Sequence, residues 1–415
     1  MAHDVILNYK LNKEIFPLSD QSQIGYLLIK AKPKNTSAGE RAPINLCLVM
    51  DRSASMKGSK IENVKKAISN IIDQMVDTDY LSLVIFNEQA EVLVPGQEVA
   101  DKDQLKEQVS QLTAKDGTAI STGMTKGLEE LRKNISDNKI NRMILLTDGQ
   151  TYGDEDECFQ LAAEAATEDI LITALGVGDE WNEELVDTIA EKSSGRSDYI
   201  ATPDDIIPLF ESEMQTLKNV YAQNAEIFIR FPDNFQLRKI SRVAPTIGEL
   251  DFETIASNTM SAKLGELEND VGQSLLIELI MTPTQPGQFR MCQVDLVYDI
   301  PSESKYKQRI RQDVVAEFSA ENGKSNKIVP EVMNMVERVS AFNLQTRALE
   351  QAQLGDIVGA TQKLRAAATR LLDLNEHDLA DTALTEAQAL EQQGAMSSAG
   401  TKKLRYETRK LTQRF

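Results

Sequence analysis

The chain has 415 residues, an apolar share of 41% and a formal net charge of −19 at pH 7. This length is too great for one ordinary core and fits two or three globular domains, which the apolar share is large enough to bury. The acidic balance argues against nucleic-acid binding by the body of the protein, because phosphates would be repelled.

Neither a leader nor a membrane segment is predicted. The N-terminal stretch has no basic flank before an unbroken apolar run, and no later segment approaches 18 consecutive apolar residues. The three cysteines, Cys47, Cys158 and Cys292, are far apart and odd in number. Such spacing suits buried thiols in a reducing compartment better than a disulfide framework. We therefore expect a cytoplasmic protein.

Residues 1–42 contain two strand-like runs, "VILNYKLN" and "GYLLIKAK". From 43 to 219, continuous apolar runs alternate with helix-period segments. The runs are "INLCLVMD", "YLSLVIFN", "NRMILLTDG" and "ILITALGVG", and the expected helices cover 59–77, 102–112, 120–134, 154–168, 181–193 and 204–219. This alternation predicts an α/β domain with a mostly parallel sheet covered by helices on both faces.

Residues 220–327 show strand after strand with no helix between them: "NAEIFIRF", "FQLRKISRVA", "TIASNTMSAKL", "SLLIELIMT", "FRMCQVDLVYDI" and "QRIRQDVVAEF". Their alternation indicates an antiparallel β-sandwich. The two N-terminal strands cannot easily join the parallel sheet, so we infer that they pair with these later strands. The α/β domain is then an insertion in the sandwich.

From 328 to 415 the chain becomes helical. A first helix ends before Leu354-Gly355-Asp356, and three more are expected over 357–374, 377–393 and 397–413. Short polar or glycine-containing turns separate them, which predicts a small C-terminal helical bundle. The fold class is therefore multi-domain, α/β plus β, with a terminal bundle.

Polar side chains follow the first apolar run of the α/β domain. Asp51, Ser53 and Ser55 stand just beyond this strand, and alternate residues of an extended turn face the same side. Thr118, in a Gly-Thr turn that opens a helix, and Asp148, which ends another strand, belong to the same edge of the sheet. These five oxygen donors suit a hard divalent cation, with a sixth position left for water or a ligand.

The fragments "DRSASM", "DGTAIS" and "LLTDG", in this order on an alternating α/β segment, resemble the metal-ion-dependent adhesion site of von Willebrand factor type A domains. All five positions match that family's pattern. The resemblance, which is to the intracellular bacterial type, implies a Rossmann-like domain that binds Mg²⁺ or Mn²⁺ through Asp51, Ser53, Ser55, Thr118 and Asp148. It further implies that a partner protein completes the coordination shell with a carboxylate. Each residue by itself could instead be a helix N-cap, Thr118 above all.

The expected function is non-catalytic, metal-dependent capture of an acidic side chain of a partner protein. One alternative implied by the resemblance is a regulatory subunit of an AAA+ ATPase or of a Ser/Thr kinase and phosphatase signalling set. Another is a Mg²⁺-dependent phosphohydrolase with Asp51 as nucleophile, but such enzymes need an acid-base carboxylate two residues later, where this chain has Ser53.

The distribution of charge in the sequence also limits the kind of partner that is expected. From Asp148 to Glu213 the chain has 19 acidic residues and two basic ones, Lys192 and Arg196. The run "DEDE" (154–157) is expected near the metal face, where it first of all fits a helix N-terminus favoured by the helix dipole. Its functional interpretation is an acidic rim that favours a partner with basic residues around its carboxylate. The segment "GVGDEW" (176–181) lacks the full glycine pattern of a dinucleotide site. His3 and His377 lie outside the α/β segment, which argues against a zinc centre or histidine acid-base catalysis.

Overall fold

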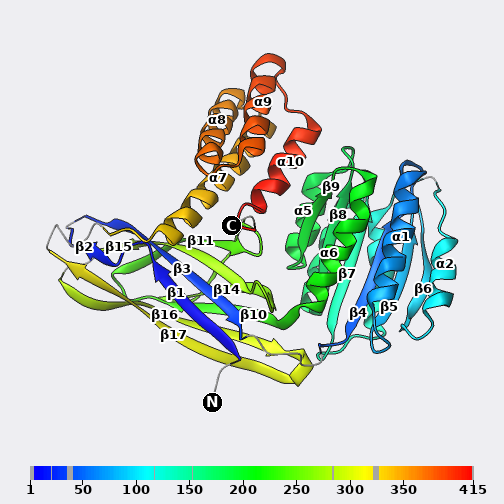
Figure 1. Cartoon of the computed structure of the whole chain (residues 1–415), viewed down its shortest axis with the longest axis horizontal. Coiled ribbons are helices and arrows are strands. Elements are labelled where there is room, and N and C mark those ends of the chain that lie inside the picture. The colour runs from blue at the N-terminus through cyan, green and yellow to red at the C-terminus, as the bar shows by residue number, and fades with distance from the viewer. Residues whose placement is uncertain are drawn as a thin grey trace. The chain divides into compact units, whose positions relative to one another are not determined.

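The computed structural model describes residues 4–19, 21–34, 41–115, 117–151, 153–282, 285–320 and 327–413. They fold into two compact units (Figure 1). One unit consists of Ala38–Tyr221 and Ile300–Tyr306, and the other of Met1–Ser37, Ala222–Asp299 and Lys307–Phe415. The chain thus enters the α/β unit from one part of the second unit and leaves it into another.

The α/β unit contains a six-stranded sheet in the order β6-β5-β4-β7-β8-β9. Five strands run parallel, and β6 pairs antiparallel with β5 at one edge. Every residue of the two central strands, β4 and β7, is buried, which confirms the predicted parallel sheet. The strands are β4 (Ile44–Asp51), β5 (Tyr80–Phe86), β6 (Ala90–Glu98), β7 (Ile140–Thr147), β8 (Leu171–Val177) and β9 (Arg196–Ile200).

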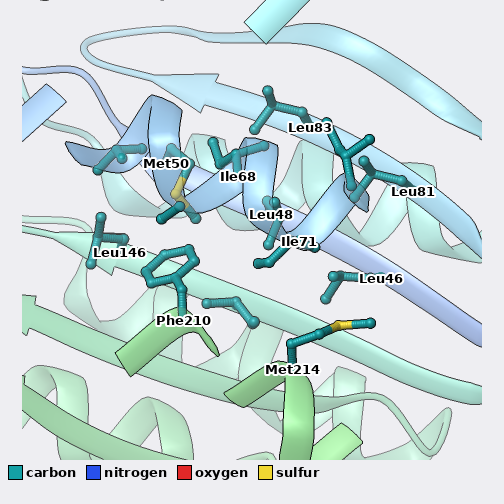
Figure 2. Close-up of a cluster of buried hydrophobic side chains, with 14 of the residues drawn as sticks. Leu46, Leu48, Met50, Ile68, Ile71, Leu81, Leu83, Leu146, Phe210 and Met214 are labelled. Carbon is teal, nitrogen blue, oxygen red and sulfur yellow. The ribbon is translucent and has the colours of Figure 1, made fainter. Parts of the chain in front are cut away.

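Helices cover both faces of this sheet. On one face α1 (Ser59–Gln74), α2 (Lys102–Ser110) and α6 (Ile206–Lys218) share an apolar core with the strands. Figure 2 shows Phe210 and Met214 of α6 next to Leu48 and Leu146 of the sheet. On the other face lie α3 (Ile120–Arg132), α4 (Glu155–Thr167) and α5 (Glu183–Lys192). All six predicted helices are present, with ends that differ by up to three residues.

The second unit contains two sheets. Their orders are β1-β3-β15-β11-β12 and β13-β14-β10-β16-β17-β2. The N-terminal strand β3 pairs antiparallel with both β1 and β15, so segments before and after the α/β domain build one sheet, as predicted. Bounds for the first sheet are β1 (Val5–Leu11), β3 (Gln23–Pro33), β11 (Phe235–Ala244), β12 (Gly248–Glu249) and β15 (Gln273–Met281).

The six-stranded sheet of this unit departs from the predictions in two places. The expected single strand over 254–264 is a hairpin of two strands, because Ser257-Asn258 forms a turn. The short strand β2 pairs parallel with β17, an exception to the antiparallel pattern. The bounds are β2 (Ile15–Pro17), β10 (Val220–Arg230), β13 (Glu253–Ala256), β14 (Thr259–Glu268), β16 (Gly287–Ile300) and β17 (Lys305–Ser319).

Four helices complete the second unit: α7 (Pro330–Gln353), α8 (Ile357–Asp373), α9 (His377–Gln393) and α10 (Ser398–Arg409). Their buried residues form one apolar cluster with Leu28, Val243, Ile247 and Leu276, from the five-stranded sheet and the turn after β11. The predicted helical bundle is therefore present and packs on that sheet. Within the part of the chain that the structure describes, every helix is too short or too polar to cross a lipid bilayer.

Candidate metal centre

The sheet topology brings the predicted site residues to one edge. The strand order reverses at β4, which lies between β5 and β7, and ligands of such sheets bind outside the carboxyl ends of the strands at this point. Asp51 is the last residue of β4, and Asp148 follows the last residue of β7. The two carboxylates therefore stand on neighbouring strand ends, at the reversal point.

Asp51 forms the floor of the site. Its side chain is fully buried, and both carboxylate oxygens accept hydrogen bonds. Oδ1 accepts from the backbone N–H of Ser53 at 2.7 Å, and Oδ2 from the hydroxyl of Thr147 at 2.7 Å. Burial raises the pKa of Asp51 to about 6, and the charge of Asp148 adds to the rise, while both hydrogen bonds oppose it. Thr147, absent from the predicted set, thus orients this carboxylate.

Two serine hydroxyls and one carboxylate oxygen converge beside Asp51. The Oγ atoms of Ser53 and Ser55 are 3.0 Å apart. Both donate to Oδ1 of Asp148, at 3.2 Å from Ser53 and 2.7 Å from Ser55. Ser53 precedes the short 3-10 helix Ala54–Met56 as its N-cap, but its side chain makes no capping hydrogen bond. The hydroxyls are therefore directed at the Asp148 carboxylate and not at a helix end.

Thr118 approaches from a loop that is fixed at both ends. The N–H of Lys115 donates to the carbonyl of Arg52, and that of Ala119 donates to the carbonyl of Asn87, each at 2.7 Å. A Cβ added to Gly149 would lie 3.6 Å from the Thr118 hydroxyl, so this side chain lies beside the residue that follows Asp148. All five predicted site residues thus lie around the ends of β4 and β7.

Helix capping does not account for Thr118. The N-cap of α3 is Ala119, one residue further on, and it makes no side-chain capping bond. The first turn of α3 is instead capped from the loop after β7. Oδ2 of Asp154 accepts from the N–H of Ser121 at 2.8 Å, and Thr151 donates its hydroxyl to the other oxygen of Asp154. Asp154, the first residue of the "DEDE" run, is thus engaged in the structure next to the site.

The donor set has the chemistry of a hard-cation site. Three hydroxyls and two carboxylates offer only oxygen, without the nitrogen or sulfur ligands that zinc prefers. In keeping with this composition, no group of three His, Cys, Asp or Glu side chains suitable for a metal occurs among the residues with described positions. Because the two serine hydroxyls and the Asp148 oxygen converge, the donor set fits a divalent cation.

One charged neighbour of the site was not predicted. Nζ of Lys60, in the first turn of α1, makes an ion pair with Oδ2 of Asp148. A lysine in the first turn of a helix opposes the helix dipole, but lysines are common in helices, so the sequence does not reveal its partner. That partner lies 88 positions away in the chain, and only the fold identifies it.

The "GVGDEW" segment has a structural explanation. A Cβ at Gly176 would lie 2.2 Å from the ring of Trp181, so the glycine makes room for the indole. The indole N–H of Trp181 donates to the carbonyl of Gly178 at 2.6 Å, and Gly178 has a φ of +75°. The turn after β8 is thus built around a buried tryptophan.

Comparisons with known proteins match both the α/β domain and the C-terminal helices. Residues 45–211 match the model of the von Willebrand factor type A domain, and residues 330–414 match the model described as "Sll0103-like, C-terminal alpha-helical domain". The chain is 31% identical to the uncharacterized protein sll0103 of Synechocystis over 67% of each chain. It is 24% identical to mouse inter-alpha-trypsin inhibitor heavy chain H3 over 67% of this chain, but it spans only 32% of that longer protein.

A solved structure shares the whole architecture. The von Willebrand factor type A protein from Catenulispora acidiphila superposes with a TM-score of 0.75, over 97% of this chain and 96% of that chain. Its sequence identity is 16%, so the likeness concerns the fold. The two sheets of the second unit, the α/β domain and the C-terminal helices thus have counterparts in another protein.

Proposed function

The chain belongs to the von Willebrand factor type A proteins that carry an Sll0103-like C-terminal helical domain, and we propose that it captures a partner protein through a divalent cation. Proteins with this domain engage in metal-dependent protein interactions in general. In this chain, Asp51, Ser53, Ser55, Thr118 and Asp148 would hold Mg²⁺ or Mn²⁺. The bound ion would supply a coordination position for an acidic side chain of the partner.

The observation that carries this proposal is the convergence of the Ser53 and Ser55 hydroxyls on one oxygen of Asp148, at 3.2 and 2.7 Å. Hydroxyls aimed at a carboxylate oxygen, and unused for capping, are arranged to share a cation with it. Thr118 and Asp51 extend the same oxygen-lined edge.

A binding role is favoured over a hydrolytic one. Asp51, the nucleophile of the hydrolytic alternative, is fully buried, and both of its oxygens accept hydrogen bonds, from Ser53 and Thr147. The position two residues later, where phosphohydrolases of this type need an acid-base carboxylate, is Ser53. We therefore assign no catalytic step to this site.

The three thiols support a proposal about the compartment. Cys47, Cys158 and Cys292 are each buried and unpaired in the structure. Burial raises the pKa of Cys47 to about 12 and that of the other two further, so none is a reactive thiolate. Unpaired buried thiols support a reducing compartment, and we propose the cytoplasm.

Thr118→Ala should weaken Mg²⁺ and Mn²⁺ binding by about tenfold or more, because it removes one neutral oxygen donor from the site. Folding stability should change by less than about 0.5 kcal/mol, since Thr118 is neither a cap nor buried core. Isothermal titration with Mg²⁺ and Mn²⁺ measures the first effect and urea unfolding in EDTA the second. A pull-down from native lysate, with and without EDTA, then tests partner capture by the wild type and the variant.

The matched control is Thr122→Ala, in the first turn of the same helix. The Thr122 hydroxyl donates to the carbonyl of Ala119 at 2.8 Å and does not take part in the site. Metal affinity should be unchanged in this variant. Partner capture that persists in EDTA and in Thr118→Ala would contradict the proposed function. An ATPase, kinase or phosphatase among proteins captured only with metal would point to a regulatory subunit.

Metal binding should also weaken as the pH falls below about 6. The cation needs the ionised Asp51, and burial raises the pKa of this carboxyl to about 6. Affinity should therefore fall by about tenfold for each pH unit below this value, and level off above it. Mn²⁺ titrations across this range give the midpoint, and circular dichroism at each pH confirms that the chain stays folded. A midpoint near the ordinary aspartate pKa of 3.8 would contradict this expectation.

A further inference from the structure

The ammonium group of Lys60 lies at the edge of the metal centre. It makes an ion pair with Oδ2 of Asp148, whose side chain is completely buried. The other oxygen of the same carboxylate, Oδ1, accepts from the two serine hydroxyls. The Lys60 side chain is 24% exposed, and Nζ would lie 3.9 Å from a Cβ at Gly178. Lys60 thus reaches across from α1 to the β7 and β8 side of the face.

The two oxygens of Asp148 therefore have different partners. Oδ1 faces the hydroxyl cluster, while Oδ2 faces the lysine. A cation held by the serines and Oδ1 can share this carboxylate with Lys60 without displacing the ammonium from Oδ2. The lysine charge then stays next to the site in both its metal-free and its loaded form.

Helix formation alone does not explain a lysine at this position. Lys60 follows the first residue of α1, where the helix dipole disfavours a positive charge. The next lysine of the helix, Lys65, pairs instead with Glu62 at 3.0 Å, the usual arrangement on a solvent-exposed helix surface. The contact with a fully buried carboxylate distinguishes Lys60 from such surface lysines.

We propose that Lys60 sets the charge of the metal centre, so that the cation binds less tightly and the loaded site binds an anion more tightly. This inference rests on the proposed function. Asp51, Asp148 and Lys60 together carry a formal charge of −1 when both carboxylates are ionised. A divalent cation brings this to +1, whereas without Lys60 the loaded site would be neutral. The excess positive charge attracts a carboxylate of the partner.

Removing this charge should change two affinities in opposite directions. In Lys60→Met, which keeps most of the aliphatic stem, Mn²⁺ should bind about tenfold more tightly because a repulsive charge is gone. Acetate, as the simplest carboxylate probe, should bind the Mn²⁺-loaded variant several-fold more weakly. Electron paramagnetic resonance of free Mn²⁺ gives the dissociation constant of Mn²⁺. Acetate displaces water from bound Mn²⁺ and so lowers the relaxation enhancement of water protons. This decrease gives the dissociation constant of acetate.

Two variants control for effects on folding and on general surface charge. Lys60→Arg keeps the charge and should lie closer to the wild type than Lys60→Met in both constants. Lys65→Met removes the same charge from the same helix, away from Asp148, and should leave both constants unchanged. Opposite shifts in Lys60→Met, with both controls near the wild type, support the proposal.

The proposal is overturned if Lys60→Met leaves Mn²⁺ affinity unchanged or weaker, or if acetate affinity does not fall. Failure of the underlying function gives a different result. If the wild type does not bind Mn²⁺, or if Thr118→Ala binds it as tightly as the wild type, the metal centre itself is rejected. If Mn²⁺ binding depends on Thr118 but does not change in Lys60→Met, only the role of the lysine is rejected.

Discussion

Asp51→Asn should abolish Mg²⁺ and Mn²⁺ binding and, at the same time, stabilise the metal-free protein above about pH 6. The loss of metal affinity should be about a hundredfold or more, because the variant removes one of only two carboxylates at the site. The gain in stability has a separate cause. Burial raises the pKa of Asp51 from 3.8 to about 6, so the ionised carboxylate is unfavourable in the folded state.

The direction of the pH effect follows from the raised pKa. Between about pH 4 and pH 6 the folded state holds a proton that the unfolded state has released, so wild-type stability falls as the pH rises through this window. Above pH 6 the full penalty is present, on the order of 3 kcal/mol. Asparagine cannot ionise, and its oxygen can still accept from the N–H of Ser53, so the variant should escape this penalty.

Urea unfolding in EDTA at about pH 5 and pH 8, together with Mg²⁺ titration calorimetry, measures both effects. The control is Asp156→Asn, which removes an exposed acidic residue from the first turn of α4 and should leave metal affinity and stability nearly unchanged. If Asp51→Asn binds metal like the wild type, Asp51 is not needed by the site. Loss of metal binding together with lower stability at pH 8 would instead assign Asp51 a structural role.

The parallel core of the α/β domain was predictable because its strands are covered on both faces. β4 and β7 are buried at every position, and such strands appear in the sequence as unbroken apolar runs. The edge strands were not predicted. β6 and β9 contain mostly half-buried or exposed residues and resemble polar loops in the sequence. Edge strands of this kind obtain their conformation from pairing, which local sequence does not encode.

The five candidate metal-site residues could be selected from the sequence because they come in three short fragments with their own local pattern. Their supporting contacts could not. Thr147 donates to an aspartate 96 positions away, and Lys60 pairs with an aspartate 88 positions away. Threonine and lysine are common at strand ends and in helices, so neither stands out in the sequence. Such contacts exist only once the fold has brought β4, β7 and α1 together.

Another buried carboxylate, Asp79, lies at the opposite end of β4 from Asp51. Its side chain is fully buried and accepts four hydrogen bonds. Arg41 donates to both oxygens, at 2.8 and 2.5 Å, while the N–H groups of Ile44 and Val76 donate to one oxygen each at 2.9 Å. Asp79 thereby joins the start of β4 to the turn between α1 and β5. The strand that ends in Asp51 is therefore held by a carboxylate at each end.

Asp79→Ala should destabilise the α/β domain by about 3 kcal/mol, because it leaves a largely buried guanidinium and two backbone N–H groups without their acceptor. The Arg41 side chain is 21% exposed, so water compensates for part of the loss. Urea unfolding in EDTA measures the effect. The control is Asp77→Ala, an exposed residue of the same turn, which should change stability by less than about 0.5 kcal/mol.

Metal affinity separates this structural role from that of Asp51. Asp79 touches none of the five metal-site residues, and its four donors belong to the other end of β4. At a low temperature, where Asp79→Ala is still folded, this variant should therefore bind Mg²⁺ like the wild type. Asp51→Asn, in contrast, should be stable and unable to bind Mg²⁺. A loss of metal affinity in folded Asp79→Ala would mean that the start of β4 controls the geometry of its end. The two carboxylates would then form one functional unit along this strand.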